Sequence, residues 1–75
     1  MTADSVRKLL HAVPFVPFSI QLANGVILRV PHSDFALLTQ GGRTLIIHTE
    51  GEDFEIVDVM LVTNINVERE AEPAS

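Results

Sequence analysis

The stretch Pro14-Phe-Val-Pro-Phe-Ser-Ile-Gln-Leu-Ala-Asn-Gly25 marks the change from helix to sheet in this chain. Pro14 lacks an N–H and disfavours helical backbone at the residue before it, so a preceding helix ends by Val13. From Phe18 to Leu22 apolar and polar residues alternate, which is typical of a strand with one buried face. The Asn-Gly pair that follows tolerates positive φ, and a tight hairpin turn is predicted there.

Residues 2–13 have the spacing of a short amphipathic helix. The helix is expected to begin at Thr2, whose hydroxyl can cap the first turn. Its apolar residues recur at i, i+3, i+4 and i+7, and they are Val6, Leu9, Leu10 and Val13. We expect this stripe to lie on the sheet that follows.

Beyond the first hairpin, alternation and turn residues predict further short strands. They are expected at residues 26–30, 35–39, 44–49, 54–57 and 62–67. Leu45 and Ile47 share one face of their strand, and Ile46 faces the other way. In the next strand Phe54 and Ile56 are expected to face inward, and Asp58 to cap one helical turn before the last strand. The four phenylalanines, Phe15, Phe18, Phe35 and Phe54, are expected to meet in one interior.

This order of elements predicts a mainly β (α+β) fold. One N-terminal helix packs on a bent five- to six-stranded antiparallel sheet that forms a small barrel, SH3-like or Sm-like by analogy of shape. Residues 1–67 are expected to form this single domain. Residues 68–75 lack periodicity and large apolar groups, so they are expected to form a mobile tail.

The motif Pro14-Phe15-Val16-Pro17-Phe18 after a helix resembles a group of short bacterial proteins that are mostly without an assigned function. The resemblance extends over the Gly25 turn, Phe35 and the segments 54–58 and 62–65. Two positions depart from the group: Val16, which is often basic there, and Pro31-His32, whose order is inverted. The resemblance implies the small-barrel fold, and it transfers no catalytic or ligand-binding residue.

Composition narrows the class of protein. A chain of 75 residues buries only about 60% of its unfolded surface, yet 47% of its residues are apolar, so self-association is expected. No apolar run approaches a membrane span and no signal-peptide pattern is present, which favours a cytoplasmic protein. Cysteine is absent, so disulfides and thiolate zinc sites are excluded. A net charge of −5 disfavours nucleic-acid binding.

No catalytic, cofactor-binding or metal-binding residue is predicted. The histidines match no metal-ligand spacing, and they are His11, His32 and His48. The run His32-Ser33-Asp34 reads as a turn, because adjacent residues cannot form the line of a hydrolase triad. The acidic residues have no EF-hand register and favour a solvated hairpin; they are Glu50, Glu52, Asp53, Glu55 and Asp58. Gly41-Gly42-Arg43 is too short for a phosphate loop.

Three classes of function remain. The first is a non-catalytic interaction or oligomerisation module that binds itself or another protein, with Ile46, Val57 or Met60 on the contact surface. The alternative is RNA or single-stranded nucleic-acid binding by an Sm-like barrel, with the cations Arg7, Lys8, Arg29 and Arg43. An enzyme would require a pocket that combines Ser33 or Asp34 with a histidine.

Overall fold

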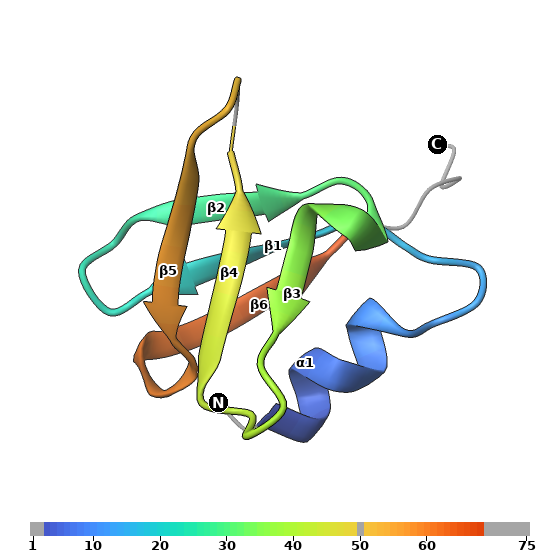
Figure 1. Ribbon diagram of the computed structural model, residues 1–75, viewed down its shortest axis with the longest axis horizontal. Coiled ribbons are helices and arrows are strands. Elements are labelled where there is room, and N and C mark those ends of the chain that lie inside the picture. The colour runs from blue at the N-terminus through green and yellow to red at the C-terminus, as the bar shows by residue number, and fades with distance from the viewer. Residues whose placement is uncertain (1–2, 50, 69–75) are drawn as a thin grey trace.

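A computed structural model describes residues 3–49 and 51–68 of the chain. One helix, six strands and two single 3-10 turns follow one another in these ranges (Figure 1). In chain order they are α1 (Ala3–Leu10), β1 (Phe18–Leu22), β2 (Ile27–Val30), η1 (Ser33–Phe35), β3 (Ala36–Leu38), β4 (Thr44–His48), β5 (Phe54–Asp58), η2 (Val59–Leu61) and β6 (Val62–Val67).

The described strands form two three-stranded antiparallel sheets, in the orders β2-β1-β6 and β3-β4-β5. The strands of the second sheet run across those of the first, and α1 lies beside β3 (Figure 1). The expected mainly β fold with one short helix is confirmed, but the strands form two sheets instead of one closed sheet. The chain leaves the first sheet at Pro31, which has no N–H for a ladder, and passes through η1 before β3 begins.

The core lies between the facing sheets and α1. Its buried side chains are Val6, Leu10, Phe18, Ile20, Val30, Leu45, Ile47, Val57, Val59 and Val62. Alternation accounts for the strand contributions, because residues i and i+2 share a face. The expected pairing of Leu45 with Ile47 on one face of β4 is confirmed, since both are fully buried while Ile46 is not.

The inward prediction for β5 is wrong. Phe54 and Ile56 are 59% and 65% exposed, whereas Val57 is buried. Val57 pairs with the buried Leu45, and Ile56 pairs with Ile46 on the opposite face. Cross-strand partners share a face, so β4 dictates which residues of β5 enter the core.

The helix also ends earlier than its apolar stripe. The last α-helical hydrogen bond described runs from His11 N–H to the carbonyl of Arg7 at 3.0 Å, so Val13 lies beyond the helix and is 95% exposed. Three of the four phenylalanines do gather at the core. Phe18 is buried, the centre of the Phe15 ring lies 5.9 Å from that of Phe18, and Phe35 packs against the core as a partly buried residue.

The predicted turns form with the expected residues. Two hydrogen bonds close the loop between β1 and β2. Gly25 N–H donates to the carbonyl of Leu22 at 2.9 Å, and Leu22 N–H donates to the carbonyl of Val26 at 2.8 Å. Gly25 has φ 92°, and the side chain of Asn24 accepts from Val26 N–H at 3.0 Å. The loop therefore holds three residues, and the expected two-residue turn is replaced by a turn with one left-handed glycine. Asp58 caps η2 as predicted, accepting from Met60 N–H at 2.9 Å.

The C-terminal end of β6 is joined to the rest of the molecule through Glu68. Its N–H donates to the carbonyl of Pro17 at 2.8 Å, and its carboxylate binds Arg29. Residues 69–75 of the expected tail lie outside the described residues. In the described part of the chain, no helix has both the length and the apolar character needed to cross a membrane.

Candidate interaction surface

An apolar row crosses the outer face of the β3-β4-β5 sheet. Leu37 on β3 pairs with Ile46 on β4, and Ile46 pairs with Ile56 on β5. Directly paired residues project on the same face, so these three side chains lie side by side. Leu37 and Ile56 are 60% and 65% exposed, and Ile46 between them is half-buried. Below, "the apolar row" means these three residues.

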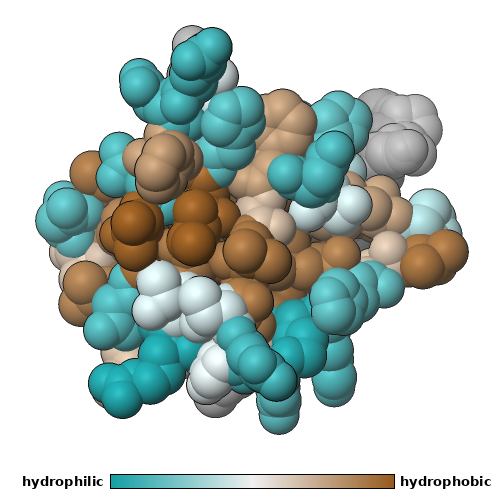
Figure 2. Space-filling model, in the orientation of Figure 1, coloured by the Kyte–Doolittle hydropathy of each residue, from teal (hydrophilic) through white to brown (hydrophobic). Residues whose placement is uncertain are grey.

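The row forms a continuous apolar band on the surface. Figure 2 shows brown side chains crossing the middle of the face over β5, β4 and β3, with teal groups above and below. Phe54, at the start of β5, adds a third exposed apolar side chain next to His48, its partner on β4. Contiguous exposed apolar patches on small proteins often mark binding surfaces.

Of the three contact residues expected from the sequence, the structure supports two as surface groups. Ile46 is the centre of the apolar row, and Met60 is 76% exposed on η2. Val57 is buried against Leu45 and cannot contribute to a contact surface. Leu37 and Ile56 were missed, because only the pairing of three strands reveals that they extend the row from Ile46.

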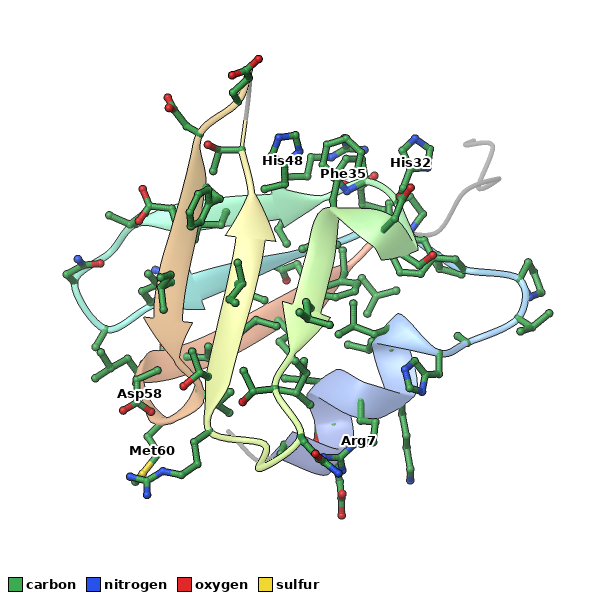
Figure 3. The ribbon with its side chains drawn as sticks, in the orientation of Figure 1. Arg7, His32, Phe35, His48, Asp58 and Met60 are labelled. Carbon is green, nitrogen blue, oxygen red and sulfur yellow. The ribbon has the colours of Figure 1, made fainter. Side chains whose placement is uncertain are left out.

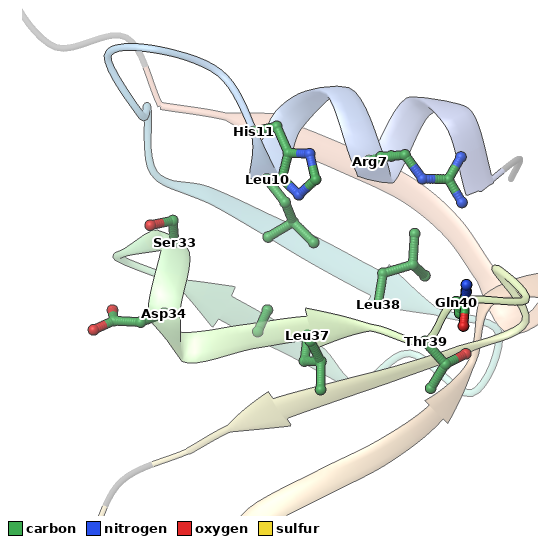
Figure 4. A pocket seen from close by; sticks show the side chains of 10 residues that line it. Arg7, Leu10, His11, Ser33, Asp34, Leu37, Leu38, Thr39 and Gln40 are labelled. Carbon is green, nitrogen blue, oxygen red and sulfur yellow. The ribbon is translucent and has the colours of Figure 1, made fainter.

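A groove of about 590 Å³ lies between α1 and β3. Leu10 and Leu38 point toward each other across it, and Leu37 points to the other side of β3 (Figure 4). Arg7 lies at the end of the groove near Gln40, and the opposite end is formed by His11, Ser33 and Asp34. Below this space is called the α1–β3 groove.

The groove brings Ser33 and Asp34 to the same cavity as a histidine, which is the combination that an enzyme would require. All three side chains are exposed, and the hydroxyl of Ser33 points away from the imidazole of His11 in Figure 4. Among the described residues, no hydrogen bond joins His11 to Ser33 or to Asp34. The nucleophile–base contact of acyl transfer is therefore not formed in this arrangement.

A second cluster lies along one rim of the second sheet. The Phe35 ring lies 5.6 Å from the imidazole of His32 and 5.3 Å from that of His48, and the three rings follow one line in Figure 3. A smaller groove of about 380 Å³ is lined by Phe35, His48 and Arg29. His11 follows the end of α1 and lines the α1–β3 groove, and within the described ranges the three histidines do not combine into a group that could hold a metal ion.

Arg29, which lines the same groove as Phe35 and His48, forms a bidentate ion pair with Glu68. Arg29 Nε and Nη2 donate to the two carboxylate oxygens of Glu68 at 2.7 and 2.9 Å. The hydrogen bonds from Arg29 hold the pKa of Glu68 below its usual range, and the same bonds raise the pKa of Arg29. The positive charge of Arg29 is thus matched within the domain.

The remaining candidate residues have structural positions. Of the acidic residues, Glu52, Asp53 and Glu55 are exposed on the β4–β5 hairpin, Asp58 caps η2, and Glu50 lies outside the described residues. Gly42 adopts φ 77° in the turn between β3 and β4. Within residues 3–49 and 51–68, no group of three or more histidine or acidic side chains is arranged to hold a metal ion.

Comparison with known proteins adds no identification. No protein-family model, curated protein or solved structure matches this chain.

Proposed function

We propose that this protein is a non-catalytic interaction module that associates with itself through the second sheet. The observation that carries the proposal is the apolar row, in which Leu37, Ile46 and Ile56 stand in register on an exposed face. A short domain gains stability when such a face is covered, because its own core is small.

The free energy gained by burying the apolar row can be compared with the cost of association. Fully burying an aliphatic side chain stabilises by about 1.5–3 kcal/mol, so completing the burial of the row contributes about 2–5 kcal/mol for each copy. Association costs an estimated 4–15 kcal/mol in lost rigid-body freedom. The row therefore supports association, and further contacts must accompany it.

The strand order is also compatible with the SH3-like or Sm-like barrel proposed from the sequence. β6 follows a single 3-10 turn and returns to pair with β1, which joins the two ends of the domain.

Sedimentation equilibrium over a wide concentration range tests the proposal. The wild-type chain is expected to be a dimer or higher oligomer at micromolar concentration. The double variant Leu37→Asp/Ile56→Asp should be monomeric, since two carboxylates desolvated in an interface are strongly unfavourable. Ile27→Asp is the matched control, because Ile27 is 63% exposed but lies on β2, in the other sheet. A wild-type chain that stays monomeric at every concentration would contradict self-association.

Single-stranded RNA or DNA binding is the second candidate, and the aromatic rim favours it. Exposed imidazoles of His32 and His48 flank Phe35, and nucleobases stack on such rings. Against it, Arg29 beside the rim is neutralised by Glu68, and the chain has a net charge of −5. Filter binding at low salt decides: retention that is lost in a His32→Ala/His48→Ala variant supports this function, and no retention excludes it.

A further inference from the structure

The outer face of the β3-β4-β5 sheet is open to a partner across all three strands. The helix α1 packs against the opposite face, because its side chains Val6 and Leu10 belong to the same core as the inward-facing Leu45. Leu37 points away from the α1–β3 groove, onto the outer face (Figure 4). A partner can therefore cover the whole apolar row while the helix stays in place.

The two ends of this face carry charges of opposite sign. Glu52 and Asp53 lie in the hairpin that connects β4 with β5, and Arg43 directly precedes β4 at the other end. All three side chains are exposed, and the ion pairs found within residues 3–49 and 51–68 involve none of them. Below, Glu52 and Asp53 are called the acidic hairpin. Within the described residues, its charge and that of Arg43 therefore stay unmatched.

Arg43 and Asp53 lie at equal distances from the apolar row. Arg43 is three residues before Ile46 on β4, and Asp53 is three residues before Ile56, the residue of β5 that pairs with Ile46. Because β4 and β5 are antiparallel, these steps lead in opposite directions along the sheet, each by about 10 Å. Rotation of one copy by half a turn about the row therefore brings its Arg43 to the level of Asp53 in the other copy.

We propose that two copies of this chain pack their outer faces together in antiparallel orientation, with the two-fold axis along the apolar row. The inference rests on the self-association proposed above and gives it a geometry. Each residue of the row then faces its own counterpart, and Arg43 of each copy meets the acidic hairpin of the other. Sheets that pack face to face lie about 10 Å apart with their strands aligned to within about 30°, and the two rows fill this space.

Charge complementarity favours a second copy in this orientation. If the two-fold axis ran along β4 instead, each acidic hairpin would lie against the acidic hairpin of the other copy, and like charges would repel. With the axis along the apolar row, two equivalent contacts of opposite sign form. The charges at the two ends of one face are thus complementary to each other, which is the condition for a surface to bind its own copy.

The same orientation gives Phe54 a neighbour of suitable chemistry. Phe54 then lies over the far end of β5 in the other copy, where the carboxylate of Asp58 is held by Met60 N–H at 2.9 Å. The side chain of Met60 is 76% exposed at that end. Contacts between a thioether and an aromatic ring are favourable, so this end of the face can accept the ring.

The area of the face reaches that of a small specific interface. Leu37, Ile56 and Phe54 are 60%, 65% and 59% exposed. With the half-buried Ile46 and the exposed His48, and at roughly 200 Å² for a large side chain, each copy covers roughly 500 Å². The two copies together bury roughly 1,000 Å², which is about the lower limit of specific interfaces. Phe54 and His48 thus supply the contacts that the row alone lacks.

Complementation between two variants tests this geometry. Arg43→Glu sets an acid against the acidic hairpin of the other copy, and Glu52→Arg/Asp53→Arg sets cations against Arg43. Either variant alone should raise the dimer Kd about tenfold in sedimentation equilibrium, because repulsion replaces attraction at two sites. An equimolar mixture should recover the wild-type Kd as a heterodimer, since both contacts again join opposite charges.

The matched control is Lys8→Glu, which makes the same change of charge on the exposed side of α1. It should change Kd by no more than about twofold, since charges far from a contact are screened. Mixing it with Glu52→Arg/Asp53→Arg should not recover the wild-type Kd. Circular dichroism verifies that each variant is folded.

Cysteine cross-linking locates the axis independently of charge. The chain contains no cysteine, so single variants give unambiguous products. A bismaleimide with a reach of about 10 Å, the spacing of packed sheets, should cross-link Leu37→Cys with itself and Ile56→Cys with itself. With the axis along β4, Leu37 would face Ile56 of the other copy, and only a mixture of the two variants would cross-link. Ile27→Cys, on the other sheet, is the control that should stay uncross-linked.

The outcomes separate the two proposals. If the wild-type chain associates but the charge mixture does not recover its Kd, or only the mixed cysteine variants cross-link, the antiparallel geometry is wrong and self-association stands. If the wild-type chain is monomeric at every concentration, both proposals fail.

Discussion

Gly42 in the β3–β4 turn lies so close to Ala3 in the first turn of α1 that a Cβ atom on Gly42 would stand 2.9 Å from the Cβ of Ala3. Gly42 also has φ 77°, in the left-handed region that side chains disfavour. The first turn of α1 therefore packs against the turn that connects β3 and β4.

Gly42→Ala is therefore expected to destabilise the domain by about 1–3 kcal/mol, from backbone strain and from the contact with Ala3. Gly41→Ala is the matched control, because open space surrounds Gly41, and it should change the free energy of unfolding by less than about 0.5 kcal/mol. Urea unfolding measures both. Equal effects of the two substitutions would show that the close approach does not matter.

Phe18 and Phe54 should respond very differently to truncation. Phe18 is fully buried, so Phe18→Ala is expected to cost about 3–5 kcal/mol of unfolding free energy, enough to unfold much of a small domain. Phe54 is largely exposed, and Phe54→Ala should cost less than about 1 kcal/mol. Thermal unfolding followed by circular dichroism distinguishes them. The measurement is repeated in the Leu37→Asp/Ile56→Asp background, where association does not contribute to stability. If Phe54→Ala lowers the free energy of unfolding as much there as Phe18→Ala does, the exposed position of Phe54 is contradicted.

The cap on η2 is expected to contribute measurably to stability. Asp58→Ala removes the acceptor for Met60 N–H and should cost about 1 kcal/mol. Asp53→Ala, in the exposed turn before β5, removes the same charge without a cap and serves as the control. If both variants lose the same stability in urea titrations, charge alone and not the cap explains the effect.

The Arg29–Glu68 pair predicts a dependence of stability on pH. Because the pKa of Glu68 is lowered in the folded state, its contribution is complete above the usual range of a glutamate carboxyl. It is lost as the pH falls through the lowered pKa of the folded protein. The stability difference between the wild type and Glu68→Gln should therefore shrink in acid, and NMR titration should show a higher Glu68 pKa in Arg29→Gln. An unchanged Glu68 pKa in that variant would contradict the pair.

The strands and turns were predictable where local chemistry alone selects them. Alternation of apolar and polar residues predicted β1 at Phe18–Leu22 and β6 at Val62–Val67. Asp58, a capping residue, predicted the helical turn η2 between β5 and β6. Gly25 marked the first hairpin, although its loop contains one residue more than expected. In each case the cause is the φ range, capping group or side-chain period of residues that are neighbours in the chain.

The candidate surface depended on neighbours that are distant in the chain. Phe54, Ile56 and Val57 are all apolar, and only pairing with Leu45 and Ile46 selects Val57 for the core. That choice puts Ile56 outside, in line with Leu37. The linear order of residues thus specified which segments become strands and where they turn. Only the folded chain decides which residues of β5 face the core, how the strands divide into two sheets and where the apolar row lies. The reason is that cross-strand register assigns each side chain to a face, and a local sequence pattern does not contain that register.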